Sequence, residues 1–167
     1  KYVQDVLDLM HKKFGLRTHV EYAKRGKWCN IRFHSKIVAT LFSRLFGRGF
    51  NKKTVPYWML TLPLKKQKGL LMGILRGDGF PILNRHTTNI RVTMSNPHIV
   101  YAVWAMFARM NILGSFRKDN LQALSTTNPY TCVVTSHSAG ALTQEIFPQA
   151  EIHKITQIAM QRHLYKY

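Results

Sequence analysis

Acidic side chains are scarce in this chain, whose 167 residues include 7 Asp and Glu against 25 Lys and Arg. The formal net charge is therefore +18 at pH 7. Residues 1–63 hold 13 basic and 3 acidic side chains and residues 64–167 hold 12 and 4, which excludes a basic tail as the source of the charge. A distributed excess of this size predicts a continuous basic surface for a polyanion, and we expect that polyanion to be nucleic acid.

Cysteine and long apolar runs are also lacking. Cys29 and Cys132 are isolated, match no metal-ligand spacing and offer no disulfide framework, so we expect both in the core or in strands. The apolar run around residues 70–75 is far too short to span a bilayer. The N-terminus has no signal-peptide layout. We expect an intracellular protein, of a bacterial or archaeal cytoplasm or of an organelle. Because the chain begins at Lys1, we expect a processed, excised or truncated polypeptide.

The first third of the chain is predicted to form a helix, a β-hairpin and a second helix. Apolar residues recur at helical spacing until Gly15, and two later segments alternate polar and apolar residues around a basic turn. The predicted elements are a helix at Tyr2–Phe14, strands at Leu16–Tyr22 and Trp28–His34, and a helix at Ile37–Phe46 that ends at Gly47. A basic linker, Arg48–Lys53, then leads to a short helix near Val55–Leu62.

The rest of the chain contains a further strand and then the same order of elements. Pro97 suits the first turn of a helix, where its missing N–H is not needed. The predicted elements are a strand at Asn89–Ser95, a helix at His98–Met110, a hairpin of Ser115–Arg117 and Tyr130–Thr135, a helix near Ala139–Phe147, and a polar helix or tail at Gln149–Tyr167.

Helix, hairpin and helix thus occur twice, over residues 3–47 and 98–148. The first helices align at an offset of 96 residues, as in Met10 and Met106. The second helices align at an offset of 101, as in Phe46 and Phe147, because the second hairpin has a longer loop. We interpret the chain as one structural design used twice.

The most informative segment, Leu71–Gly79, has the sequence LMGILRGDG. It predicts a short apolar helix that ends on a single carboxylate, Asp78. The glycines at 69, 73 and 77 are four residues apart and therefore lie on one face of that helix. Since a glycine face lets another backbone approach closely, we expect two such helices side by side with their acids together.

These nine residues resemble, without gaps, the name motif of the LAGLIDADG homing endonuclease family, in its two-motif form. Leu71, Gly73, Asp78 and Gly79 match the motif, Ile74 and Leu75 are conservative changes, and Arg76 stands where the consensus has an acid. The stretch 55–63 is similar to the linker that precedes second motifs in this family. The segment 91–96, followed by a helix, also fits.

The resemblance implies an α+β fold built from two αββαββα halves about a pseudo-two-fold axis. The motif helices would form the central interface through Gly69, Gly73 and Gly77, and antiparallel saddle sheets would lie in the DNA major groove. Residues 1–53 would be the rear part of an incomplete first half, 54–63 a linker helix, 64–148 the second half, and 149–167 a C-terminal helix or tail.

The resemblance also implies a metal site, because the final acid of each motif binds a divalent cation beside the scissile phosphate. It assigns Asp78 to catalysis and, with Gly77, to a site for Mg²⁺ or Mn²⁺. Hard cations take carboxylate and phosphate oxygens, activate water and stabilise the charge that develops in phosphodiester hydrolysis. The family also places a lysine near the start of the helix after each second hairpin. Lys36 matches that position, and His137 falls near its equivalent in the second copy.

Polar residues of the strands are the expected DNA-reading groups. Arg, Asn and Gln can make bidentate contacts to guanine or adenine. The candidates are Arg17, His19, Glu21, Asn30, Arg32 and His34 in the first hairpin, and Asn89, Arg91, Thr93, Arg117 and Gln122 in the second half. Phosphate contacts, which give affinity without sequence information, are expected from Lys24, Arg25, Lys27, Lys52, Lys53, Lys65, Lys66, Arg85 and Lys118.

The sequence contains no second glycine-faced helix with a terminal acid, since Asp5, Asp8 and Asp119 lie in other contexts. We therefore expect a complementary first-motif segment, ahead of residue 1 or in a partner chain, and no cleavage by this chain alone.

Three functions are compatible with these features. The first is a site-specific double-stranded DNA endonuclease, borne by an intron or intein, with an asymmetric target site. The second is an RNA maturase of the same fold, which binds its host intron RNA and need not cut it. The strong charge and the absence of the family lysine at the position of His137 are compatible with this function. The third is a DNA-binding relative whose nuclease site has decayed, against which the retention of Asp78 argues.

Overall fold

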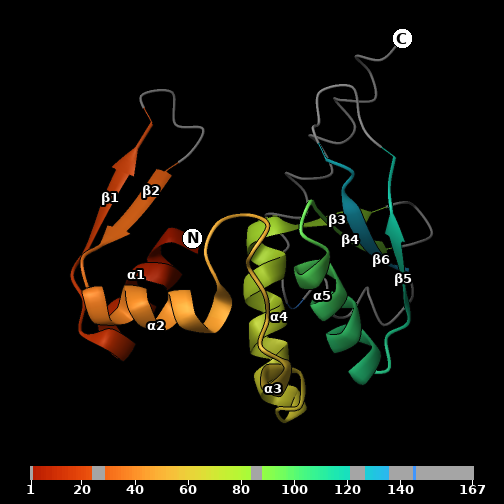
Figure 1. The fold of residues 1–167 in the computed structure, drawn as a ribbon, viewed down its shortest axis with the longest axis horizontal. Coiled ribbons are helices and arrows are strands. Elements are labelled where there is room, and N and C mark those ends of the chain that lie inside the picture. Colours follow the sequence, from red (N-terminus) through yellow and green to blue (C-terminus); the bar gives the residue numbers. More distant parts are fainter. Residues whose placement is uncertain (1, 24–28, 84–87, 121–126, 136–144, 146–167) are drawn as a thin grey trace. The chain divides into compact units, whose positions relative to one another are not determined.

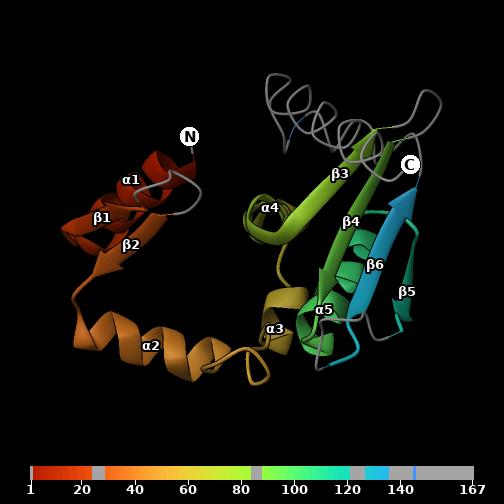
Figure 2. The ribbon, with the colours of Figure 1, turned by 90° about the horizontal axis from the view of Figure 1, so that it is seen from above.

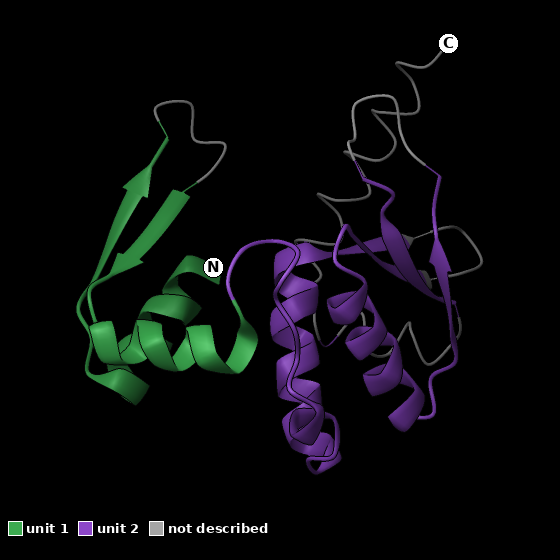
Figure 3. Cartoon of the chain, in the orientation of Figure 1, with its two compact units in different colours: residues 1–47 green, residues 48–167 purple. Residues whose placement is uncertain are grey.

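The structure is a computed structural model of the whole chain. It describes all residues except 1, 24–28, 84–87, 121–126, 136–144 and 146–167. The chain divides into two compact units, residues 1–47 and 48–167, which are coloured separately in Figure 3. Of the described helices, none is long and apolar enough to cross a membrane.

Unit 1 contains the helices α1 (Tyr2–Phe14) and α2 (Lys36–Phe46) and the strands β1 (Thr18–Tyr22) and β2 (Cys29–Phe33) (Figure 1). The two strands form an antiparallel hairpin that pairs Thr18 with Phe33 and Tyr22 with Cys29. The Ser35 hydroxyl accepts a hydrogen bond from the Val38 N–H at 3.2 Å, which caps the start of α2. Gly47 ends α2 with a φ of 75°, a conformation that glycine adopts without steric cost.

Unit 2 contains the helices α3 (Tyr57–Leu60), α4 (Leu64–Asp78) and α5 (Pro97–Arg109) and the strands β3 (Gly79–Leu83), β4 (Thr88–Met94), β5 (Gly114–Lys118) and β6 (Tyr130–Thr135). The four strands form one antiparallel sheet in the order β3-β4-β6-β5. Helix α5 covers one face of this sheet (Figure 2). The buried core of unit 2, to which α4, α5 and the sheet contribute, consists of Leu71, Leu75, Ile90, Val92, Val100, Val103, Met106, Phe107, Ile112, Cys132 and Val134.

Two buried amides fix the stretch that leads into α4. The Gln67 side chain is fully buried and its Nε2 donates to the carbonyl oxygens of Leu60 and Leu62, at 3.0 and 2.5 Å. Asn96 caps α5 by accepting from the His98 N–H, and its Nδ2 donates to the Phe50 and Lys53 carbonyls at 2.9 and 2.7 Å. The chain segment before α4 is therefore hydrogen-bonded to α4 and to the residue that caps α5.

The predicted repeat is present in the described elements. Strand β1 shifted by 96 residues coincides with β5, and β2 shifted by 101 residues lies within β6. The predicted helices at the start of both copies are α1 and α5, and both hairpins pair as expected. The predicted helix near 139–147 and the tail at 149–167 lie outside the described residues, apart from the helical residue 145.

Strand β3 follows α4 without a loop and pairs with β4 at one edge of the sheet. The residue pattern alone did not predict this strand, although the αββαββα order implied by the family resemblance contains it. The short helix predicted near residues 55–62 is shorter than expected, because α3 extends only over Tyr57–Leu60. The prediction that both cysteines lie in the core or in strands is confirmed, since Cys29 is in β2 and Cys132 is in β6. Cys132 is buried in β6, and burial raises the pKa of its thiol to about 11, so that thiol stays neutral at physiological pH.

Candidate nucleic-acid interface and metal-binding carboxylate

Helix α4 has one buried face and one open face. Gln67, Leu71 and Leu75, four residues apart, are fully buried against the rest of unit 2. The three glycines of the motif region, at 69, 73 and 77, are exposed on the other side of the helix. A Cβ placed on any of them would meet no described atom within 4 Å. Within the described part of the chain, the glycine face therefore has no partner.

Asp78 is the last residue of α4 and its side chain is exposed. The next residue, Gly79, donates its N–H to the Leu75 carbonyl and begins β3, so the helix runs directly into the sheet (Figure 2). A Cβ on Gly79 would lie 2.5 Å from the Leu75 oxygen and 2.8 Å from its Cα. Only glycine fits at this junction. The close approach of Gly79 to Leu75 therefore constrains the position of Asp78 at the end of α4.

The surroundings of Asp78 suit one half of a metal site. The C-terminal end of a helix carries partial negative charge, which favours a cation beside an acid placed there. Mg²⁺ is usually bound through one or two carboxylates together with substrate phosphates, so a single exposed carboxylate is an appropriate ligand. Among the described residues, no group of three His, Cys, Asp or Glu side chains could hold a metal ion. The remaining ligands would have to come from elsewhere.

Two further residues, Lys36 and His137, are proposed for catalysis. Lys36 is the first residue of α2, is exposed and belongs to unit 1. His137 lies outside the described residues. The catalytic role of both stays a prediction.

The sheet of unit 2 presents a polar face on the side opposite α5. Alternation along β4 buries Ile90 and Val92 and leaves Asn89, Arg91 and Thr93 on the other face. The register adds Arg117 of β5 to that face, because it pairs with Thr131, which in turn pairs with Thr93. Four residues predicted to read DNA are thus gathered on one surface. Arg85 and Gln122 lie outside the described residues.

Lys118 alternates to the opposite face from Arg117. Its register partner is Tyr130, and its Nζ lies 6.0 Å from the centroid of that ring. The predicted phosphate-binding lysines at 52, 53, 65 and 66 are all exposed.

A hydrogen-bonded network that the sequence analysis did not identify organises the polar face. Asp119 accepts from Arg117 Nε at 2.7 Å and from the Thr131 hydroxyl at 2.5 Å, and the Thr131 and Thr93 hydroxyl oxygens are 2.8 Å apart. The hydrogen bond from Thr131, followed by the hydrogen bond and charge of Arg117 and the charge of Arg91, lowers the pKa of Asp119 below its ordinary value. The only sequence signal was the spacing of 117 and 119, which strand alternation places on one side.

The hairpin of unit 1 carries the other predicted reading residues. Register pairs join His19 with Arg32 and Glu21 with Asn30, so these four side chains share one face. Glu21 is engaged in an ion pair with Arg32 at 2.8 Å, which limits its availability to accept from a base. This pair is exposed and therefore contributes at most about 1 kcal/mol to stability.

Arg17 and His34 lie just outside the two strands of unit 1 and are exposed. The basic turn with Lys24, Arg25 and Lys27 lies outside the described residues.

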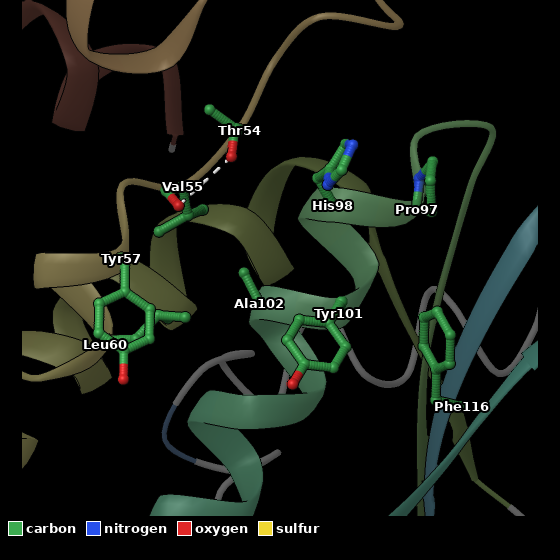
Figure 4. A pocket seen from close by; sticks show the side chains of 9 residues that line it. All are labelled: Thr54, Val55, Tyr57, Leu60, Pro97, His98, Tyr101, Ala102 and Phe116. Atoms are coloured by element: carbon green, nitrogen blue, oxygen red, sulfur yellow. Dashed lines mark hydrogen bonds between the residues drawn. The ribbon is translucent and has the colours of Figure 1, made fainter.

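Unit 2 also has an apolar pocket of about 360 Å³, which is lined by α3 and the segment before it, by α5 and by β5 (Figure 4). Its lining residues are Thr54, Val55, Tyr57, Leu60, Pro97, His98, Tyr101, Ala102 and Phe116. The lining contains no carboxylate and one histidine, so it offers no set of residues for hydrolytic chemistry.

We expect Gly73→Ala to raise the free energy of unfolding of the chain by about 0.5–1 kcal/mol. Alanine is favoured over glycine in a helix interior, and the added Cβ would meet no described atom. Urea denaturation followed by circular dichroism measures this effect. If the glycine face packs against a second helix, the same variant should weaken the association of the chain with the segment that carries that helix, as measured by sedimentation. An unchanged association would mean that the glycine face is not the contact surface.

Comparison of the whole structure with solved structures shows its fold. A structure from a study of mesophilic variants of the homing endonuclease I-DmoI matches with a TM-score of 0.57 at 11% sequence identity, over 86% of this chain and 68% of that chain. The crystal structure of I-DmoI in complex with DNA and Mn matches with a TM-score of 0.60 at 9% identity, over 89% and 73%. A variant of I-DmoI in complex with its target DNA in the presence of 2 mM Mg gives 0.57 at 9% identity, over 87% and 71%.

At these identities the likeness establishes the fold alone. The chain has the mixed helix and antiparallel-sheet fold of I-DmoI, a LAGLIDADG homing endonuclease, and the predicted α+β class is confirmed. No protein-family model and no curated protein matches the sequence.

Proposed function

We propose that this chain belongs to a metal-dependent, site-specific double-stranded DNA endonuclease of the LAGLIDADG type, of intron or intein origin. The observation that carries the proposal is helix α4. Its buried face anchors it to unit 2, while its open glycine face leads to the exposed carboxylate of Asp78. A helix of this kind is suited to pair with another and to present its acid at the contact.

The proposed catalytic unit needs a second acid from a complementary segment or chain. Two facing carboxylates, with the phosphate oxygens of DNA, would supply the oxygen ligands that Mg²⁺ or Mn²⁺ takes. The metal would activate water and stabilise the charge that develops on the scissile phosphate. Asp78, with Gly77 beside it, would hold the cation, and Lys36 and His137 are the further candidates near the phosphate.

The polar strand faces would supply recognition in the major groove. The I-DmoI structures in complex with DNA and with Mn or Mg support DNA as the partner and a divalent cation as the cofactor. The net charge of +18 supports a polyanionic partner in general.

Binding measurements with the full chain test this proposal against the maturase alternative. We expect duplex DNA to bind at least about 10-fold more tightly than structured intron RNA at matched salt, with an affinity that falls steeply as salt rises. Fluorescence anisotropy between 50 and 200 mM salt measures both quantities, with and without Mg²⁺. Tighter binding of the RNA across this range would favour the maturase and contradict the DNA assignment.

A further inference from the structure

Three residues on neighbouring strands form a row across the polar face of unit 2. Arg117 of β5 pairs in register with Thr131 of β6, which pairs with Thr93 of β4. Asp119, two residues after Arg117, lies beside this row and accepts hydrogen bonds from Arg117 Nε at 2.7 Å and from the Thr131 hydroxyl at 2.5 Å. Thr131 is fully buried, whereas Thr93 and Arg117 are exposed. The inner member of the row is therefore structural, and the outer two can meet a ligand.

The chemistry of these groups fixes the direction of every hydrogen bond. An ionised carboxylate only accepts, and the hydrogen bonds from Thr131 and Arg117 keep the pKa of Asp119 below its ordinary value. Thr131 must then give its one hydroxyl proton to Asp119. The 2.8 Å contact between the two threonine oxygens consequently has Thr93 as the donor.

The row therefore presents two opposite polarities to a ligand. Thr93 donates its hydroxyl proton to Thr131, so toward a ligand the Thr93 oxygen can only accept a hydrogen bond. Arg117 donates its Nε–H to Asp119, which orients the guanidinium and leaves the donors of its two terminal nitrogens available. A fork of donors beside an acceptor-only hydroxyl is a defined hydrogen-bonding pattern.

A G·C base pair has the complementary pattern in the major groove. Guanine offers the acceptors N7 and O6, and the cytosine paired with it offers its N4 amino donor. Thymine offers an acceptor and a methyl group, which match an acceptor-only hydroxyl poorly.

We propose that Arg117 and Thr93 together recognise one G·C base pair, with guanine at Arg117 and the cytosine amino group at Thr93, and that Asp119 is the positioning residue that sets both polarities. The inference rests on the proposed function, since it requires the polar face of unit 2 to enter the major groove of duplex DNA.

Selection of bound duplexes from a randomised library, with the full chain, provides the test. We expect the wild-type protein to select G·C at one position. Thr93→Val, which keeps the shape and removes the hydroxyl, and Arg117→Lys, which keeps the charge and removes the fork, should both relax the preference at that same position, each by about 10-fold or more. Ser115→Ala is the matched control, because Ser115 is exposed on the same face of β5 and outside the row.

Asp119→Asn gives a result that a purely structural role would not produce. An amide in this place can donate to Thr131, which would let Thr131 donate to Thr93 and free Thr93 to donate outward. We expect the selected base at this position to change toward one with an acceptor at that edge, such as thymine. Thermal melts of each variant show that the fold is retained.

The failures are distinguishable. A wild-type chain that selects no duplex contradicts the proposed function and this inference with it. A chain that selects a specific duplex, with Thr93→Val and Arg117→Lys changing no position or two different positions, overturns this inference and leaves the endonuclease assignment standing.

Discussion

Asp78→Asn is expected to reduce cleavage of target DNA by at least about 10³-fold while DNA binding is retained. The substitution keeps the size of the side chain and removes the charge with which the exposed Asp78 would hold a divalent cation. Nothing in the core changes, because Asp78 projects from the end of α4 whereas Leu71 and Leu75 hold the helix in place. The fold and the strand faces should therefore be unaffected.

The measurement is Mg²⁺-dependent cleavage of a plasmid that carries the duplex selected by the wild-type chain. The complementary first-motif segment or chain is supplied in the same reaction. Asp8→Asn is the charge-matched control, because Asp8 is an exposed acid of α1, in unit 1. Binding is measured on the same duplex without metal. Cleavage by the Asp78→Asn protein at the wild-type rate would remove Asp78 from the catalytic site and with it the central argument for the nuclease.

Gly79→Ala is expected to destabilise unit 2 by about 1–3 kcal/mol. The added Cβ would lie 2.5 Å from the Leu75 carbonyl oxygen and 2.8 Å from the Leu75 Cα. These are backbone atoms of a helix whose side chain at 75 is fully buried, so no flexible group can move away. Relief requires the helix end or the start of β3 to shift, which would also move the Asp78 carboxylate.

Thermal denaturation measures the effect as a fall in Tm of about 2–4 °C per kcal/mol for a chain of this size. Gly69→Ala is the matched control, since its Cβ would meet no described atom, and it should keep or raise Tm. If Gly79→Ala melts like the wild type, the junction between α4 and β3 tolerates a side chain and the position of Asp78 is less constrained than proposed.

The helices and hairpins could be predicted because their signals are local. The spacing of apolar residues predicts α1, α2 and α5. Ser35 precedes α2 and caps it with its side-chain oxygen, and Gly47 ends α2 with a positive φ that favours glycine. The glycine face of α4 and its terminal acid could also be placed from spacing alone. These features depend on residues within a few positions of one another.

The missed features depend on contacts between distant residues. Strand β3 contains Pro81, which in sequence argues against a strand, but β3 is at the edge of the sheet, where a missing N–H is tolerated. The partnership of Asp119 with Thr131 spans twelve residues and exists only because β5 and β6 pair in one register. No periodicity in the sequence reports that register.

The unequal cores of the two units have a consequence for the energetics of recognition. Among the described residues of unit 1, only Met10 and Val38 are buried, and its 47 residues contain a two-stranded hairpin. Domains this small bury little surface, so we expect unit 1 to open locally at a lower free energy than unit 2 and to exchange its amide hydrogens sooner. The hairpin of β1 and β2, whose polar residues are proposed to contact DNA bases, would then become ordered when DNA binds. A negative heat-capacity change of binding would reveal that ordering.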